Sequence, residues 1–216
     1  MKRFFMLDKF NTWYDWRLIL TAKSAPKPEP KTNYVKLDGV SGSLDFTEAL
    51  TGEVAYDDRT VTASFSASEG DYVSREQLFR DITTALHGRK IQLIEPDDPE
   101  HYYLGRVRVL DWVNTPAYAT FSIEATCEPW RYAVNESERR VDVSGGMDLV
   151  IVNRGDKTVT PTITVSDAME ITFNGTATTL SAGSYKITDL RLVHGANVIG
   201  LSGYGTVTFT YREASL

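Results

Sequence analysis

Three histidines are the side chains of this 216-residue chain best suited to acid–base catalysis, because imidazole titrates close to neutral pH. His87, His101 and His194 are far apart in the sequence, and each lies in or next to a predicted turn. A Ser-His-Asp triad assembles in space, so their spacing alone does not exclude one. The chain nevertheless lacks the glycine-flanked serine of a nucleophile elbow. We therefore expect surface histidines, no catalytic residue and no enzymatic activity.

The densest polar cluster runs from Glu95 to His101 and contains four carboxylates, two prolines and one imidazole. Such groups could bind a hard cation, but the spacing of an EF-hand loop, with its glycine and final Glu, is absent. The cluster lies between two alternating apolar runs, Lys90–Ile94 and Tyr102–Leu110. We interpret it as a solvated hairpin tip and expect no metal site.

Two glycine-rich stretches, Gly39–Gly42 and Gly203–Gly205, could in principle cradle a phosphate. Neither is followed by Lys-Ser/Thr or placed in a predicted strand-to-helix turn, and phosphate-binding loops require both features. We interpret both stretches as turns and expect no cofactor. The single cysteine, Cys127, excludes an intrachain disulfide and a cysteine zinc cluster. It shares the apolar face of an alternating run, so we expect it to be a small buried hydrophobe.

Two other kinds of site would need side chains from the C-terminal third. A glycosidase uses two carboxylates about 5–9 Å apart across a cleft. The candidates for that pair are Asp167, Glu170 and Asp189. A carbohydrate-binding module would instead use exposed rings, for which the candidates are Phe173, Tyr185 and Tyr204. Nothing in the spacing of the carboxylates favours a site over a solvated surface, and such rings more often fill a core or an interface.

The elements that would position these side chains are mostly strands. Tyr14–Ala22, Val61–Ala67 and Ala117–Cys127 each alternate apolar and polar residues, which is typical of strands with one buried face. With 42% hydrophobic and 24% charged residues, the composition suits one large globular domain or two modest ones. The formal net charge of -6 argues against tight nucleic-acid binding and against docking on anionic membranes.

One segment has a helical period instead. From Ser74 to Leu86, apolar residues fall on one stripe, and we expect this to be the main helix. Ser74 and Gln77 have the spacing of a capping box, in which each side chain bonds to a backbone amide of the first turn. Gly88, just beyond the stripe, provides a C-terminal stop.

The remaining segments indicate how the chain is divided. Three prolines at alternate positions make Pro26–Lys31 a stiff, exposed connector or arm. The stretch from Arg131 to Gly146 is polar and charged, so we expect an N-terminal domain over residues 1–132, a linker over 133–147 and a small β-sandwich over 148–216. Its short strands are expected at Leu149–Asn153, Thr158–Val165, Glu170–Phe173 and Thr206–Arg212, with a hairpin turn at Asn174-Gly175.

The start of the chain carries no sign of export. The apolar stretch within Met1–Leu7 is shorter than the core of a secretory signal, and no run approaches the ~20 apolar residues of a membrane span. We expect the protein to be made and folded in a cytoplasm, with no membrane partner.

Over residues 1–132 the order of several motifs resembles the N-terminal domain of the distal tail proteins of siphophages and related prophages. These motifs are Trp13–Leu20, Pro26–Lys31, Leu37–Thr47, Tyr56–Thr60, Leu86–Lys90, Tyr102–Arg106 and Glu124–Tyr132. The C-terminal part resembles the small galectin-like sandwich that follows in that family, on Asn153–Gly155, Gly195–Ile199 and the last strand ending at Tyr211-Arg212. The fold implied is mainly β with one helix (α+β), an antiparallel β-sandwich or split barrel followed by a small β-sandwich.

The resemblance implies an architectural role at the virion tail tip, with synthesis in the bacterial host cytoplasm. Six copies would form a hexameric ring that joins the tail tube protein to the tail-associated lysin or fibre protein of the baseplate. DNA would be a partner only as transient cargo in the channel. The alternative is a carbohydrate-binding module that recognises the host surface, and a hydrolase is the third possibility. A ring subunit of this kind needs no catalytic residue, metal or cofactor.

Overall fold

The computed structural model describes residues 4–49, 52–110 and 112–216, and these residues form two compact units. The first unit ends at Arg131 and also includes Leu216, and the second runs from Tyr132 to Ser215. Neighbouring strands pair antiparallel in both units, and α1 is the one helix of the described chain. This confirms the predicted fold class, mainly β with one helix. No helix within the described ranges is both long and apolar enough to span a membrane.

The first unit is built on a sheet whose main path runs β2-β1-β7-β8-β10-β6-β3, and β9 pairs with β10 beside this path. Its strands are β1 (Met6–Leu7), β2 (Phe10–Asn11), β3 (Ile19–Ser24), β6 (Arg59–Ala67), β7 (Lys90–Glu95), β8 (Asp98–Val109), β9 (Val113–Asn114) and β10 (Ala119–Ala133). The predicted strand over Tyr14–Ala22 is wrong in its first half, because residues 12–16 form turns and Arg17 adopts a positive φ of 54°. The strand begins only at Ile19.

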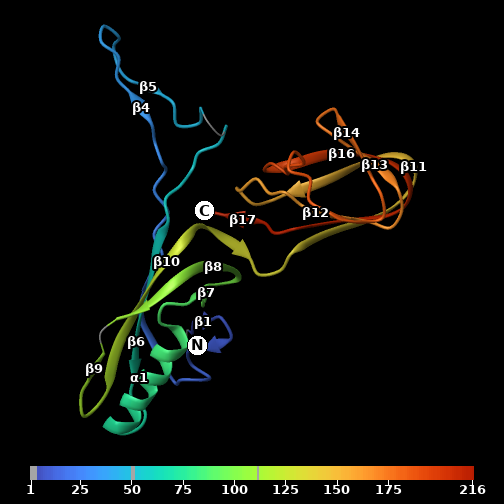
Figure 1. Ribbon diagram of the computed structural model, residues 1–216. Coiled ribbons are helices and arrows are strands. Elements are labelled where there is room, and N and C mark those ends of the chain that lie inside the picture. Colours follow the sequence, from blue (N-terminus) through green and yellow to red (C-terminus); the bar gives the residue numbers. More distant parts are fainter. Residues whose placement is uncertain (1–3, 50–51, 111) are drawn as a thin grey trace. The chain divides into compact units, whose positions relative to one another are not determined.

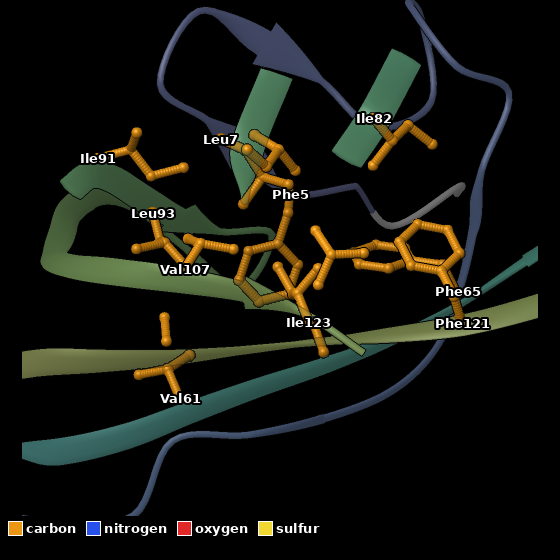
Figure 2. Packing of buried hydrophobic residues seen from close by; sticks show 14 of the residues in the cluster. Phe5, Leu7, Val61, Phe65, Ile82, Ile91, Leu93, Val107, Phe121 and Ile123 are labelled. Atoms are coloured by element: carbon orange, nitrogen blue, oxygen red, sulfur yellow. The ribbon is translucent and has the colours of Figure 1, made fainter. Parts of the chain in front are cut away.

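Alternation along β6 and β10 separates a buried face from an exposed one. In β6 the odd-numbered residues from Arg59 to Ala67 are buried, and in β10 the odd-numbered residues from Ala119 to Cys127 are buried. Phe65 and Phe121 lie directly opposite each other across the two strands. Figure 2 shows them beside Ile82 of the helix, with Phe5 and Ile123 close by. Removing this apolar surface from water stabilises the unit, because burial contributes roughly 25 cal/mol per Å².

The helix α1 (Tyr72–Leu86) covers this core with Ile82 and Leu86. Its predicted capping box is wrong: the N-cap is Asp71, whose carboxylate accepts from the Ser74 amide at 2.8 Å and from the Ser74 hydroxyl at 2.5 Å. Asp and Ser are both strong N-cap residues. Asp71 lies three residues before Ser74, and from there its carboxylate oxygen reaches the free backbone amide of Ser74. The predicted stop is confirmed, since Gly88 has a φ of 76° and donates to the Val107 carbonyl.

The second unit contains a six-stranded sheet folded over on itself. Its strands are β11 (Ser137–Asn153), β12 (Thr162–Val165), β13 (Met169–Phe173), β14 (Thr176–Leu180), β15 (Gly183–Tyr185) and β16 (Gly195–Tyr211). β17 (Ala214–Ser215) pairs with β10, and within this unit the Ala133 amide donates to the Glu213 carbonyl. Asn174 and Gly175 both have positive φ between β13 and β14, which confirms the predicted hairpin turn.

A glycine bend divides the two longest strands of this unit, β11 and β16, which pair along all 17 residues. Gly145 faces Gly203, and both have positive φ. On one side of the bend β16 pairs with β12, and on the other side it pairs with β13. A single ribbon therefore contributes to both layers over the core around Phe209 and Ile199.

Two expectations differ from this structure. Residues 137–147, expected to belong to a linker, form the first half of β11. Most of their side chains are polar and exposed, but Val143 is buried in the core of the second unit and Val141 packs against it, so the segment is part of the folded unit. Gly203–Gly205, expected to form a turn, lies inside β16, so that prediction is wrong.

Candidate functional site

The three histidines, which were predicted to lie at the surface, each make a polar contact within their own unit. His87 and His194 are exposed, and His101 is half-buried. The His87 Nδ1 accepts from the Val109 amide at 3.2 Å, whereas the His194 Nδ1 donates to the Gly155 carbonyl at 3.0 Å. The His101 Nδ1 lies 2.8 Å from an Asp98 carboxylate oxygen. These bonds fix loops and strand ends.

The acidic cluster Glu95–His101 is a tighter hairpin than expected, since β7 and β8 pair up to Glu95 and Asp98. Three of its four carboxylates face cations of the same unit. Glu95 lies 2.6 Å from the Lys23 ammonium, Asp97 lies 3.2 Å from it, and Asp98 contacts Arg131 at 3.1 Å. In the part of the chain that the structure describes, no group of three or more His, Cys, Asp and Glu residues could hold a metal ion. The cluster is the hairpin tip that was predicted, with Asp97 and Glu100 exposed, and ion pairs hold three of its carboxylates.

The glycosidase candidates do not line one cleft. Asp167 accepts from the neighbouring Ser166 hydroxyl at 2.9 Å, and Glu170 is exposed on β13. Asp189 borders a groove of about 170 Å³ together with Phe173, and neither of the other two acids contributes to it. The general acid and its partner would have to face one another across a single cleft. This geometry gives no support to hydrolysis.

The three rings proposed for a sugar platform are also separated. Phe173 and Tyr185 pack against the core of the second unit, and Tyr204 is 72% exposed. Phe173 ends β13 and Tyr185 ends β15, and β16 and β12 lie between these strands in the sheet. Stacking on a sugar requires rings that share one exposed surface. The carbohydrate-binding alternative therefore gains no support from this region.

Cys127 fits its predicted place as a small buried hydrophobe. Its side chain has no exposed surface, and burial raises the pKa of the thiol to about 12. The thiol packs against Gly105 of the neighbouring strand, where a Cβ added to the glycine would lie 2.3 Å from the sulfur. A buried, neutral thiol is a poor nucleophile.

The feature of the first unit that stands out is a long hairpin between β3 and β6, here called the arm (described residues 30–49 and 52–56). Pro30 pairs with Tyr56 at its base, and β4 (Tyr34–Val35) pairs with β5 (Leu44–Asp45) further out. Between them the Lys31 amide donates to the Ala55 carbonyl at 2.8 Å. Figure 1 shows the arm leaving the sheet as a thin two-stranded extension. The expectation of a stiff, exposed connector or arm at Pro26–Lys31 is met only in part: Pro30 and Lys31 begin the arm, whereas Pro28 is buried.

The outer part of the arm presents large apolar side chains to solvent. These side chains are 39–60% exposed and belong to Tyr34, Val35, Leu37, Val40, Leu44 and Phe46. The predicted turn at Gly39–Gly42 is confirmed, since Gly39 and Gly42 have φ of 83° and 86° near the end of the arm. An isolated two-stranded hairpin is only marginally stable in water, and exposed apolar clusters mark protein interaction sites. The arm therefore has the chemistry of a contact surface.

Sequence patterns alone did not single out these apolar residues. The sequence did indicate something unusual here, because a segment between Pro30 and Gly52 contains six large apolar residues, more than an ordinary solvent-exposed loop carries. Their exposure could not be read from the sequence, since the same pattern would suit a short buried hairpin.

Comparison with known proteins identifies the fold. No protein-family model and no curated protein matches the chain. The crystal structure of the Dit protein of SPP1, described as a paradigm of the hub adsorption apparatus in phages that infect Gram-positive bacteria, is similar over 100% of both chains, with a TM-score of 0.73 and 15% identity. A conserved protein of unknown function from Pseudomonas aeruginosa PAO1 has a TM-score of 0.26 and 11% identity, with 91% and 100% of the chains covered. That second likeness is too weak to inform the fold. The chain therefore has the fold of a Dit-type phage tail protein.

Proposed function

We propose that this chain is a structural hub subunit of a bacteriophage tail tip. The observation that carries the proposal is the likeness to the SPP1 Dit protein over the whole length of both chains. That protein is described as a hub of the adsorption apparatus, which is a role in assembly and not in turnover. By this reading the protein is a virion component made in the host cell. Its partners are the tail tube protein on one side and the tail-associated lysin or fibre protein on the other.

The arm supports the finer proposal that copies of the chain form a closed ring. In a cyclic assembly each contact joins two different patches of the same protein, one from each neighbour. An apolar extension of one subunit that covers a neighbour satisfies this requirement and removes the exposed side chains of the arm from water. A hexamer is the number implied by the sequence resemblance, with DNA passing through the central channel.

The oligomeric state of the purified full chain tests this proposal. Mass photometry over a range of concentrations, followed by negative-stain imaging, should reveal hexamers with a central hole. The triple variant V35S/L37S/F46S should shift the equilibrium to monomers without changing the melting temperature of the first unit. A matched control, V150S/V152S/V198S, replaces three valines of the second unit that are 47–56% exposed and should still form rings.

Other outcomes would contradict the proposal. A wild-type protein that stays monomeric at every concentration, and in the presence of its tail tube protein, would refute ring formation. A monomer that binds cell-wall polysaccharide would favour the carbohydrate-binding alternative.

A further inference from the structure

The turn between β13 and β14 contains the one asparagine of the chain that is followed directly by glycine, Asn174-Gly175. Asn174 and Gly175 have φ of 49° and 80°, and both residues are exposed. Within the described residues, the Asn174 side chain makes no hydrogen bond. A Cβ built on Gly175 would meet no atom within 4 Å, so open space surrounds the turn. The side-chain amide of Asn174 is therefore both accessible to water and free to move.

The remaining asparagines of the chain differ from Asn174 in one of two ways. Four of them are held by side-chain hydrogen bonds, and these are Asn11, Asn114, Asn153 and Asn197. Asn33 and Asn135 are exposed, but they are followed by Tyr34 and Glu136. Exposure, an unbonded amide and a following glycine thus coincide at residue 174.

This combination permits a reaction between two adjacent residues. The backbone nitrogen of Gly175, once it has lost its proton, attacks the side-chain carbonyl carbon (Cγ) of Asn174. The N–Cγ bond forms, the bond from Cγ to the amide nitrogen breaks, and the amide nitrogen leaves as ammonia. The resulting five-membered succinimide then takes up one water. Cleavage of its N–Cγ bond gives aspartate, and cleavage at the backbone carbonyl gives isoaspartate. Glycine favours the attack because it has no Cβ to restrict the approach.

The attack requires the turn to open briefly, because pairing of β13 with β14 holds both residues in the native turn. β14 lies at the edge of its sheet and pairs with β13 alone. Of its five residues, Leu180 is buried, and Thr176 to Thr179 are exposed or half-buried. An edge strand with one buried side chain opens at a lower free energy than the core of the unit.

We propose that Asn174 is a site of spontaneous deamidation in the folded protein, and that the isoaspartate product disrupts the β13–β14 hairpin. Isoaspartate passes the main chain through its Cβ and Cγ, which adds one atom to the backbone of the turn. A two-residue turn fixes the register in which Phe173 lies opposite Thr176, so the added atom is incompatible with this pairing. Aspartate keeps the ordinary backbone and tolerates positive φ, so it preserves the turn.

The hairpin forms one wall of the groove of about 170 Å³ in the second unit. Asn174 lines this groove together with Asp189 and the apolar side chains of Ile171 and Phe173. Deamidation replaces a neutral amide with a carboxylate in the groove that already contains Asp189, and like charges repel. The isoaspartate form therefore loses strand pairing and also gains an unfavourable charge contact. This inference concerns the second unit alone and does not depend on the proposed function.

Peptide mapping of the folded, full-length chain after prolonged incubation tests the reaction, with fresh protein digested alongside. Trypsin releases residues 158–186, in which Asn174 is the sole asparagine, and residues 132–139, in which Asn135 is the sole asparagine. The first peptide should gain the mass difference between an amide and an acid and separate into aspartate and isoaspartate forms. Its rate should rise in proportion to the hydroxide concentration, because the attacking nitrogen must lose a proton. The second peptide is the control and should keep its mass. Deamidation of Asn174 only in urea-unfolded protein, or equal reaction at Asn135, would overturn the proposed site.

Calorimetry of the second unit tests the effect on the hairpin. Fresh Asn174→Asp protein carries the new charge without the added backbone atom, so it should melt close to fresh wild type. Aged wild type rich in isoaspartate should melt at least about 4 °C lower than fresh wild type. Asn174→Gln would have to form a six-membered ring, so its aged and fresh forms should melt alike. If aged and fresh wild type melt alike, or if fresh Asn174→Asp loses as much as aged wild type, the assigned effect of isoaspartate is wrong.

Discussion

Arg75 provides the sharpest test of how the first unit is held together, because it is a charged side chain with only 2% of its surface exposed. Its guanidinium donates to the Asn114 side chain at 3.0 Å and to three backbone carbonyls: Gly70 at 2.6 Å, Thr115 at 2.7 Å and Pro116 at 3.2 Å. The Arg75 fork thus joins the start of α1 to the segment that follows β9.

Arg75→Met keeps most of the volume of the side chain and removes every donor. A hydrogen bond from a charged donor contributes about 1.5–3 kcal/mol, and an acceptor left buried without a partner costs about 1–3 kcal/mol. Because these terms overlap within one network, we expect a loss of about 3–5 kcal/mol in the free energy of unfolding. Arg75→Lys retains the charge but not the planar fork, so it should lose about half as much.

Urea unfolding followed by tryptophan fluorescence measures this loss in the first unit alone, because all four tryptophans precede residue 131. Arg80→Met is the matched control: it lies on the same helix, is exposed, and donates to the Gln77 side chain. It should change the free energy of unfolding by less than about 0.5 kcal/mol. If Arg75→Met and Arg80→Met unfold at the same urea concentration, the assigned role of the buried fork is wrong.

Three further predictions concern strand packing and the buried thiol. Gly105→Ala would place a Cβ 2.3 Å from the Cys127 sulfur and 2.8 Å from the Thr126 carbonyl, and should destabilise the first unit by about 1–3 kcal/mol in the same urea assay. Gly203→Ala should lower the melting temperature of the second unit by calorimetry, because its φ is 142° and the new Cβ would lie 2.9 Å from that of Met169. Gly146→Ala, with open space around it, is the control that should be tolerated. Cys127 should resist alkylation in the folded protein at pH 8. The pKa of the Cys127 thiol is about 12 in the folded protein, against an ordinary value of 9.0. Between these two pH values the thiol ionises only in the unfolded state, so the free energy of unfolding should fall as the pH rises. Cys127→Ala should remove this part of the pH dependence.

Sequence patterns predicted the elements whose signals are local. The helix Ser74–Leu86, the strand Val61–Ala67 and the Asn174-Gly175 turn depend on nearby residues, and all three are present. The predicted N-cap was wrong because two residues that favour this position, Asp71 and Ser74, lie within the same turn. Arg75 was missed although it lies on the stripe of Leu78 and Ile82, where a charged residue signals a buried network.

Features that depend on distant pairing could not be predicted. Glycines with positive φ occur both in tight turns and at bends in long strands, so Gly39–Gly42 and Gly203–Gly205 look alike in the sequence. Only the pairing of β16 with β11 distinguishes them. The segment Pro26–Lys31 predicted an arm, but not its length. That length follows from the hydrogen bond between the Lys31 amide and the Ala55 carbonyl, two residues that are far apart in the sequence.

The bent ribbon of β11 and β16 has a consequence for biosynthesis. β11 ends at Asn153 and β16 begins at Gly195, so the ribbon that contributes to both layers of the second unit cannot close until residues 195–211 have left the ribosome. Pairings between distant segments form slowly, because the intervening chain must first lose its conformational freedom. The N-terminal sheet has all its long strands available earlier, since β10 starts at Ala119. During translation the first unit therefore acquires its structure while the second is still an open chain, and the two units mature at different times.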